Sequence, residues 1–357
     1  MNKLRFLIVG SGYRAELYGR IAAGNPELFE ALFLCRSAEK AELMRIKTGT
    51  MATVSSDEAE SFRPDFVVIA VNKDSIAKTA CLWARRGYAV LAETPAGTSG
   101  DELLELWNAH EAERLRIIFC EQYLRYPSLT EGLYALDSGL LGTPQTLYLS
   151  VAHDYHAASL IRRLLLVQNE AYTVRGETAA FPIVETDSRL GSVTDGHLAE
   201  KQHTVLYIVF SSGKRAVYDF SGVQYRSFIR SRHLTLRCDR GEWSDDAILY
   251  LDSENIPKQK RLAPIVPEKY RALASRCLFA DPADRGPGLR LDSAQDEFAV
   301  SSMLLDMGEY LRGGPEPYDF KDALRDAYFW ALIKEAERSP WDEISSRRMP
   351  WDTQEVK

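Results

Sequence analysis

The stretch LRFLIVGSGYRA, residues 4–15, decides the fold class of this chain. Its first six residues are mostly apolar, which is typical of a strand buried in a parallel sheet. GSGYRA at 10–15 then fits the G-x-G-x-x-G/A pattern: the first glycine permits a tight turn, the second lets a pyrophosphate approach the backbone, and the small last residue lets helix and strand pack closely. Because the pattern follows a strand and opens a helix, it predicts a dinucleotide site rather than a turn used for packing alone. The residues that would form it are Gly10, Ser11, Gly12, Tyr13 and Arg14.

Apolar strands and helices alternate along the first 122 residues. Alternation of this kind indicates a parallel sheet covered by helices on both faces. The sequence therefore predicts an α/β Rossmann domain, a doubly wound parallel sheet, over residues 1–122. Its expected strands are 4–9, 31–35, 65–71, 88–92 and 116–119, with a weaker one at 52–56, and its expected helices are 14–23, 38–46, 74–86 and 101–115.

The pattern changes in the remainder of the chain, residues 123–357. HTVLYIVF at 203–210 and KRAVYDF at 214–220 alternate apolar and polar residues around SSG, which predicts a β-hairpin. Clustered strands beside long helices predict an α+β domain with a largely antiparallel sheet. Its other expected elements are extended segments at 145–155, 233–238 and 247–252 and helices at 127–137, 293–312 and 318–337, while 167–200 shows no clear period.

Composition narrows the class of partner. The net charge of −7 argues against binding a nucleic-acid backbone, although RSFIRSRH at 226–233 is a basic cluster that suits either a solvated loop or a site for an anionic or polyhydroxylated ligand. Five scattered cysteines without a C-x-x-C pair, and the lack of metal-ligand spacing among His, Asp and Glu, predict reduced thiols and no metal site. The apolar run at 4–9 is too short for a signal peptide or a membrane span, so we expect a cytoplasmic protein with no membrane partner.

The end of the second expected strand bears on the choice of cofactor. Enzymes that bind NAD place an acid about 20 residues after the glycine pattern, where it holds the ribose 2′-hydroxyl. This chain has Cys35 and Arg36 there instead. The missing acid and the Arg36 guanidinium favour NADP slightly over NAD, and stacking of Arg36 on the adenine is the alternative.

Five segments together resemble the glucose–fructose oxidoreductase/inositol dehydrogenase (Gfo/Idh/MocA) family. The resemblance runs over nearly the whole chain, and the order of a Rossmann domain followed by an antiparallel sheet domain also matches. It implies hydride chemistry with NAD or NADP on sugars or polyols, and a homo-oligomer, dimer or tetramer, formed through the second sheet. The segments are GSGYRA, IAVNKDS at 69–75, AETP at 92–95, Tyr126-Pro127 followed by SGLLGTPQ, and HDYHAASLIR at 153–162.

The same resemblance assigns further cofactor contacts and shows where this chain departs from the family. Thr94 stands where the family's Glu-Lys-Pro motif has its catalytic lysine, and Ser75 stands where the family often has histidine. The family's Asp/His segment is reduced here to His153-Asp154-Tyr155-His156. Thr94 is therefore expected to position the cofactor or substrate by a hydrogen bond. The other residues expected beside the cofactor are Ala70, Val71, Asn72, Glu93 and Gln122.

A threonine hydroxyl cannot accept a proton near neutral pH, so the general base must lie elsewhere. His156 falls where the family's substrate histidine falls, and an imidazole with a pKa of about 6.5 can shuttle a proton at working pH. We therefore predict His156 as the catalytic base, with Tyr155 as a second catalytic residue. Four residues are expected to contact the substrate: Asp154, Arg162, Tyr225 and Arg230.

Three functions are compatible with these residues. The first is an NAD(P)-dependent oxidoreductase that moves a hydride to or from a carbinol carbon of a sugar, sugar derivative or polyol. The second is a glycosidase or lyase that oxidises its substrate, eliminates and then reduces, so that the cofactor is recycled within each turnover. The third is a catalytically silent sensor that binds nucleotide. The missing lysine favours the sensor, and His156 with the polar segment QYRSFIR at 224–230 favours an enzyme.

Overall fold

The computed structural model describes residues 3–188, 191–274, 289 and 293–352. These residues form two compact units. Unit 1 holds residues 3–122, 272–274 and 296–328, and unit 2 holds 123–188, 191–271, 289, 293–295 and 329–352. Residues 296–328, which lie in the C-terminal part of the chain, thus group with the first 122 residues.

Unit 1 is built on a six-stranded sheet in the order β3-β2-β1-β4-β5-β6, with every neighbouring pair parallel. This is the predicted doubly wound sheet, and β1 lies at its centre because it pairs with β2 on one side and β4 on the other. Strand order therefore reverses between β1 and β4, where such sheets bind ligands. The strands are β1 (Leu4–Val9), β2 (Phe29–Leu34), β3 (Met51–Thr53), β4 (Phe66–Ile69), β5 (Ala89–Glu93) and β6 (Ile117–Cys120).

Helices connect these strands, and three of them begin at a serine cap. The side chains of Ser37, Ser55 and Ser99 each accept a hydrogen bond from a backbone N–H in the first turn. The cap at Ser55 corrects the weak strand expected at 52–56, because the chain already turns into a short helix there. The helices are α1 (Tyr13–Gly24), α2 (Ala38–Thr48), α3 (Ser56–Ser61), α4 (Lys73–Arg85) and α5 (Gly100–Glu113).

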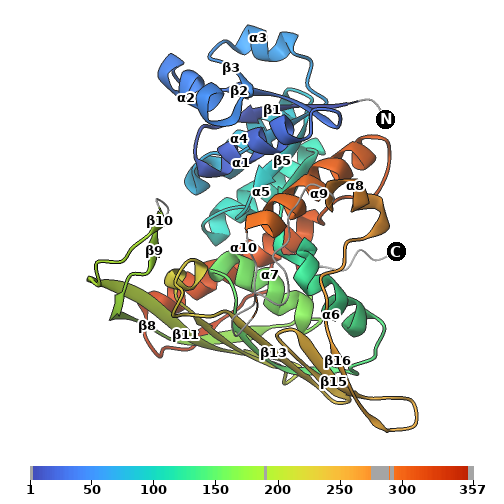
Figure 1. The fold of residues 1–357 in the computed structure, drawn as a ribbon. Coiled ribbons are helices and arrows are strands. Elements are labelled where there is room, and N and C mark those ends of the chain that lie inside the picture. Colours follow the sequence, from blue (N-terminus) through green and yellow to red (C-terminus); the bar gives the residue numbers. More distant parts are fainter. Residues whose placement is uncertain (1–2, 189–190, 275–288, 290–292, 353–357) are drawn as a thin grey trace. The chain divides into compact units, whose positions relative to one another are not determined.

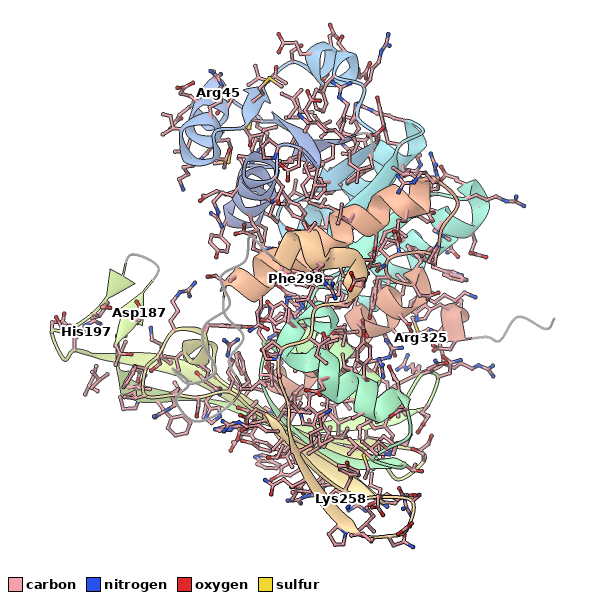
Figure 2. The ribbon with its side chains drawn as sticks, turned by 45° about the vertical axis from the view of Figure 1, so that its right-hand side comes forward. Arg45, Asp187, His197, Lys258, Phe298 and Arg325 are labelled. Atoms are coloured by element: carbon pink, nitrogen blue, oxygen red, sulfur yellow. The ribbon has the colours of Figure 1, made fainter. Side chains whose placement is uncertain are left out.

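Two long C-terminal helices, α9 (Ser293–Leu311) and α10 (Phe320–Arg338), contribute to unit 1 through residues 296–328. Gly308 of α9 lies so close to Leu4 that an added Cβ would come within 2.7 Å of the leucine side chain. The Phe320 ring stacks on His110 of α5 at 3.9 Å between centroids. The buried Phe298, labelled in Figure 2, belongs to the same core.

Unit 2 is built on a nine-stranded sheet in the order β16-β15-β14-β13-β7-β12-β11-β8-β17. All pairs are antiparallel except β7 with β12, so the predicted largely antiparallel sheet is confirmed. The predicted hairpin is β11 with β12, closed at Gly213, which has a φ of +87°. Figure 2 shows Asp187 and His197 near the tip of the β8–β11 ribbon. The strands are β7 (Pro144–Ser150), β8 (Tyr172–Val184), β11 (Leu198–Phe210), β12 (Arg215–Phe220), β13 (His233–Cys238), β14 (Gly241–Ser244), β15 (Ala247–Leu251), β16 (Pro257–Arg261) and β17 (Ile344–Ser345), with β9 (Asp187–Ser188) and β10 (Gly191–Ser192) as a separate pair.

The two faces of this sheet differ. Leu147 and Leu149 of β7 are buried on the face that carries α6 (Pro127–Asp137) and α7 (Asp154–Leu164), as Figure 1 shows. Side chains alternate along a strand, so Tyr148 between them points to the opposite face, which we call the open face. The extended segment expected at 145–155 ends earlier than predicted, at Ser150, because α7 begins at Asp154. Within the described part of the chain, no helix is both long enough and apolar enough to cross a membrane.

Candidate cofactor and catalytic sites

The turn after β1 has the geometry that the glycine pattern predicts. Gly10 has a φ of +140°, and an added Cβ would lie 2.1 Å from the carbonyl oxygen of Ala70. Gly12 has an ordinary extended backbone (φ −92°), and beyond its chain neighbours no atom of the described residues lies within 4 Å of where its Cβ would be. Gly10 is therefore required by packing against β4, whereas Gly12 leaves open space at the N-terminus of α1. Open space beside free helical N–H groups suits a phosphate.

The carboxyl ends of β1 and β4 bring two predicted cofactor segments together. Val9 pairs with Ile69 in the parallel register, so the glycine turn and residues 70–72 leave the sheet side by side. Asn72 is the N-cap of α4, is exposed, and makes no side-chain capping bond. This is the point of strand reversal, and it gives a dinucleotide two backbone edges to contact.

Arg36 follows β2, the strand that pairs with β1 on the side away from β4. Val9 pairs with Leu34, so Arg36 follows the strand beside the glycine turn. Its side chain is exposed and has no hydrogen bond or ion pair with the residues the structure describes. Cys35, where an NAD-binding acid would be expected, is buried, and burial raises the pKa of its thiol. The neutral Cys35 and the uncommitted Arg36 fit a 2′-phosphate.

Arg14 and Glu93 form the centre of a buried ionic network. The Arg14 Nε donates to Glu93 Oε1 at 3.0 Å, and its Nη1 donates to Asp296 at 2.8 Å. The Tyr18 hydroxyl donates to the same Glu93 oxygen at 2.7 Å. Burial raises the pKa of Glu93, with Arg14 and Tyr18 opposing that rise, and burial also raises the pKa of Tyr18. Arg14 and Tyr18 thus already bind the Glu93 carboxylate, and its contact with the nicotinamide ribose stays a prediction.

Three buried polar atoms close to this network have no hydrogen-bond partner among the described residues. They are the Arg14 Nη2, the Thr94 Oγ1 directly after β5, and the Gln122 Oε1 just beyond β6. The amide nitrogen of Gln122 is engaged, since it donates to Asp296 at 3.2 Å. Buried polar atoms without partners are uncommon in folded proteins. These three offer two donors and one acceptor, which suits a carboxamide or a hydroxyl, so the residues present fit a nicotinamide cofactor. The remaining predicted cofactor residues, Ser11 and Tyr13, are half-buried and exposed, respectively.

Unit 2 contains a cluster of aromatic and imidazole rings, which we call the histidine–tyrosine cluster: Tyr123, His153, Tyr155, His156 and Tyr225. His156 is 4% exposed, and its ring lies 4.4 Å from Tyr123, 4.4 Å from Tyr155 and 4.9 Å from His153, measured between centroids. The two predicted catalytic residues therefore lie together. They share the start of α7, which directly follows the end of β7.

Tyr225 joins this cluster from η2, 72 residues further along the chain than His153. Its hydroxyl accepts from the backbone N–H of His153 at 2.8 Å and also hydrogen-bonds the His153 Nδ1. Burial raises the pKa of Tyr225 well above its ordinary value, with Tyr123 adding to the rise. A neutral tyrosine therefore contacts His153 throughout the physiological range.

Asp154 is committed to an ion pair. Its carboxylate contacts Lys334 of α10, which also donates to Glu337 at 2.7 Å. Burial lowers the pKa of Lys334, but the two carboxylates outweigh burial and the net shift is upward. Of the other residues predicted to contact substrate, Arg162 is buried in α7 and Arg230 is exposed on a loop after η2 (Gly222–Tyr225). Among the described residues, no group of three or more His, Cys, Asp or Glu could hold a metal ion.

Comparison with solved structures places the fold. A putative myo-inositol dehydrogenase from Sinorhizobium meliloti matches with a TM-score of 0.63 and 14% identity over 96% of this chain and 99% of that one. The WlbA dehydrogenase from Chromobacterium violaceum, in complex with NADH and UDP-GlcNAcA, matches with a TM-score of 0.63 and 13% identity over 97% of both chains. A putative NADPH-dependent oxidoreductase from Desulfitobacterium hafniense matches with a TM-score of 0.65 and 11% identity over 97% of this chain and 98% of that one. The chain has the fold of these oxidoreductases. By sequence, no family model and no curated protein matches it.

Sequence reasoning missed several residues of both sites. Tyr18 and Asp296 complete the Arg14–Glu93 network, and only the first had a local signal, since it lies one helical turn after Arg14. His153 and Tyr123 complete the histidine–tyrosine cluster. His153 lies inside the segment 153–162 that the sequence singled out, although it was given no role, and Tyr123 directly follows the predicted cofactor residue Gln122. Nothing in the sequence pairs Lys334 with Asp154.

Proposed function

We propose that this protein is an NAD(P)-dependent oxidoreductase that transfers a hydride to or from a carbinol carbon of a sugar, sugar derivative or polyol. The observation that carries the proposal is the open space in front of Gly12, at the N-terminus of α1 and at the reversal point of the sheet. The fold shared with NADH- and NADPH-linked dehydrogenases supports it.

In this proposal, backbone N–H groups of residues 10–14 hold the pyrophosphate, and residues 70–72 line the dinucleotide. When bound, a nicotinamide supplies the hydride acceptor or donor. Thr94 and Gln122 orient the reacting groups through the unpaired oxygens described above. In the oxidative direction His156 takes the proton of the carbinol hydroxyl, and a bound oxidised nicotinamide would supply the hydride acceptor, so that the product would be a carbonyl.

Arg36 gives the cofactor preference. We infer a modest preference for NADP, because a 2′-phosphate would form a charge-assisted hydrogen bond with a guanidinium that has no other partner among the described residues.

The four described cysteines are free thiols, which supports the predicted cytoplasmic location.

The proposed oligomer, a dimer or tetramer, would form through the unit 2 sheet. The open face exposes large apolar side chains, among them Tyr207 and Val209 of β11 and Leu249 of β15. These strands are separated by β14, β13, β7 and β12, so exposed apolar side chains occur on both halves of this face, as on a surface that another chain covers. Light scattering of the purified protein tests this directly, and a monomer at all concentrations would contradict it.

Titration with NADPH and NADH, followed by the fluorescence of the reduced nicotinamide, tests the cofactor claim. We expect saturable binding of both, with NADPH tighter. Oxidation of an added sugar or polyol with NADP then distinguishes the oxidoreductase from a nucleotide sensor, which would bind the cofactor and leave it unchanged with every substrate. Cofactor that co-purifies in mixed redox states and is never released would instead favour the recycling mechanism.

A further inference from the structure

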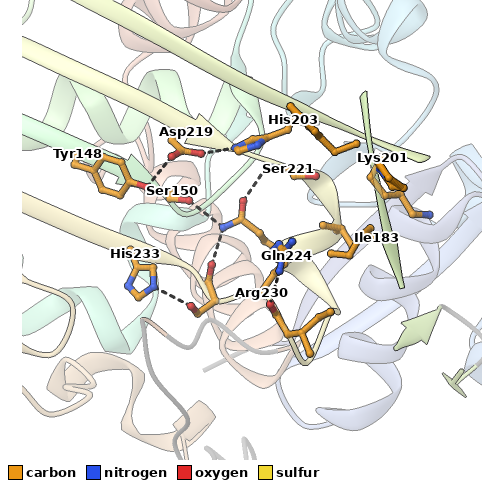
Figure 3. Close-up of a pocket in the computed structure, with 15 residues that line it drawn as sticks. Tyr148, Ser150, Ile183, Lys201, His203, Asp219, Ser221, Gln224, Arg230 and His233 are labelled. Atoms are coloured by element: carbon orange, nitrogen blue, oxygen red, sulfur yellow. Dashed lines mark hydrogen bonds and ion pairs between the residues drawn. The ribbon is translucent and has the colours of Figure 1, made fainter. Parts of the chain in front are cut away.

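A cavity of about 550 Å³ opens on the open face of the unit 2 sheet. Its size falls within the range of small-molecule sites. Strands β7, β8, β11, β12 and β13 form its floor, and the loop at 221–233 forms one side. Figure 3 shows its polar side chains converging on the same space, with Tyr148, Asp219 and His203 connected to one another.

The cavity has its floor on the other face of the sheet from the histidine–tyrosine cluster, but the two share one loop, since Gln224 lines the cavity and the adjacent Tyr225 contacts His153. Its floor residues Tyr148, His203 and Asp219 alternate with Leu149, Thr204 and Tyr218, whose side chains are buried on the other face. Helix α7, which carries His156, packs on that other face (Figure 1). The sheet therefore lies between the floor of the cavity and α7.

Hydrogen bonds fix the polar wall in advance of any ligand. Asp219 accepts from the Tyr148 hydroxyl at 2.8 Å and contacts the His203 Nε2. Burial, together with Asp219, raises the pKa of Tyr148 to about 12, so this tyrosine stays a donor. Asp219 keeps lone pairs beyond these two contacts, because a carboxylate offers about four acceptor positions. It can therefore accept from a ligand hydroxyl.

Gln224 completes this wall. Its amide nitrogen donates to Ser150 Oγ at 2.9 Å and to the Ser231 carbonyl at 2.6 Å, and its oxygen accepts from the Ser221 N–H at 2.8 Å. These bonds tie the loop to β7. The Ser221 hydroxyl donates to the Gln202 carbonyl at 2.6 Å, and the Ser231 hydroxyl bonds the His233 Nε2 at 2.8 Å, so these serines meet a ligand hydroxyl through their remaining oxygen lone pairs. A pocket with fixed donors and acceptors loses little entropy when it binds.

The part of the lining that β8 contributes is apolar. Phe181 is 55% exposed, with Pro182 and Ile183 next to it in the chain, and Ile229 of the loop is a further apolar lining residue. An exposed aromatic ring in one lining with fixed polar groups suits a molecule with one C–H face and one hydroxylated edge.

The charged side chains of the lining narrow the chemical class of the ligand further. Lys201 is paired with Glu185, so its charge is already compensated. Arg230 also lines the cavity, and its only hydrogen bond among the described residues is from Nη1 to the neighbouring Ile229 carbonyl at 2.9 Å. A guanidinium has five N–H donors in a planar fork that matches a carboxylate. Arg230 is thus available to an anionic ligand.

We propose that this cavity is a binding site for a polyhydroxylated carboxylic acid, a sugar acid, whose hydroxyl groups meet Asp219 and the serine hydroxyls and whose carboxylate meets Arg230. All lining residues belong to unit 2, and the floor of the cavity lies on the face of the sheet opposite α7. None of the apolar residues proposed to meet a second chain (Tyr207, Val209 and Leu249) lines the cavity.

Isothermal titration of the full-length protein with D-gluconate and with sorbitol tests this proposal, because the two probes differ only in the terminal carboxylate. We expect gluconate to bind at least about tenfold more tightly, the usual scale of a charge-assisted hydrogen bond. Arg230→Gln should reduce gluconate affinity to the sorbitol level. Arg226→Gln, an exposed arginine of the same loop outside the lining, is the matched control and should bind like the wild type.

Asp219→Asn and Phe181→Ala test the other two walls, and each should weaken both probes about equally. Thermal melting confirms that every variant is folded before titration. The absence of gluconate binding to folded wild-type protein, or equal binding by wild type and Arg230→Gln, would overturn the proposal. Gluconate affinity retained both in Gly12→Val, which fills the space in front of α1, and in His156→Ala would show that the signal comes from this cavity and not from the proposed oxidoreductase site.

Discussion

Gly10 and Gly12 stand two residues apart, yet the structure predicts opposite consequences for replacing them. At Gly10, a new Cβ would lie 2.1 Å from the Ala70 carbonyl oxygen and 2.8 Å from its carbon, with φ at +140°. At Gly12, φ is −92°, and in the described part of the chain only its sequence neighbours lie within 4 Å of the new Cβ. We therefore expect Gly10→Ala to damage folding and Gly12→Val to damage cofactor binding alone.

The magnitudes follow from these contacts. An L-residue in a left-handed conformation costs about 1–2 kcal/mol, and forcing backbone apart in a packed core costs about 1–3 kcal/mol more. Gly10→Ala should thus lower the free energy of unfolding by about 2–5 kcal/mol, a large part of the 5–15 kcal/mol typical of a domain. Gly12→Val changes only a helix N-cap, at a cost of about 1 kcal/mol or less. Its side chain would displace a phosphate from the helical N–H groups, which should weaken cofactor binding about 100-fold or more.

Urea denaturation and NADPH titration of both variants measure the two effects separately. Gly12→Val should unfold near the wild-type midpoint and bind NADPH poorly, while Gly10→Ala should unfold at clearly lower urea. Undiminished NADPH affinity in folded Gly12→Val would refute the assignment of the glycine turn as the pyrophosphate site. Wild-type stability of Gly10→Ala would refute the close approach of the turn to β4.

Three further predictions concern single side chains. Arg36→Ala should weaken NADPH far more than NADH in fluorescence titrations, because only the former loses a charge-assisted contact, and equal weakening would mean that Arg36 stacks on the adenine. Thr94→Ala should cost little turnover whereas His156→Ala should lose about 10²-fold or more in kcat, and an unchanged pH profile in the histidine variant would turn attention to the neighbouring tyrosine. Asp195 raises the pKa of His197 above 6.5, so this pair stabilises the fold below about pH 6.5, and the stabilisation is lost as pH rises through the raised pKa. NMR titration should show a lower His197 pKa in Asp195→Asn. An unaltered pKa would show that Asp195 is not the cause of the shift.

The glycine turn could be predicted because its signal is local. A strand, two glycines and a helix start occupy twelve consecutive residues, 4–15, and the structure brings them together as expected. The Arg14–Asp296 bond joins residues 282 positions apart, and the sequence around either residue does not predict the pairing. Contacts of that range depend on how α9 packs, which a periodic pattern does not encode.

Strand β8 could not be predicted for a different reason. Gly176 and Pro182 interrupt its alternation, and both usually argue against a strand interior. In the structure Gly176 is required because an added Cβ would lie 2.1 Å from the Val205 carbonyl oxygen of β11. Pro182 is tolerated because β17 pairs with β8 only at residues 173 and 174, which leaves the proline on an unpaired edge. Tertiary contacts thus overrode local propensity in this strand.

Hydride transfer itself is the most direct test of the account. The purified protein would be incubated with NADP and a set of aldoses and polyols carrying deuterium on their carbinol carbons, and the nicotinamide analysed by mass spectrometry. The account predicts deuterium on the reduced nicotinamide with at least one substrate, and its loss in Gly12→Val and His156→Ala. Tight binding of the cofactor with no deuterium in the nicotinamide from any substrate would contradict it.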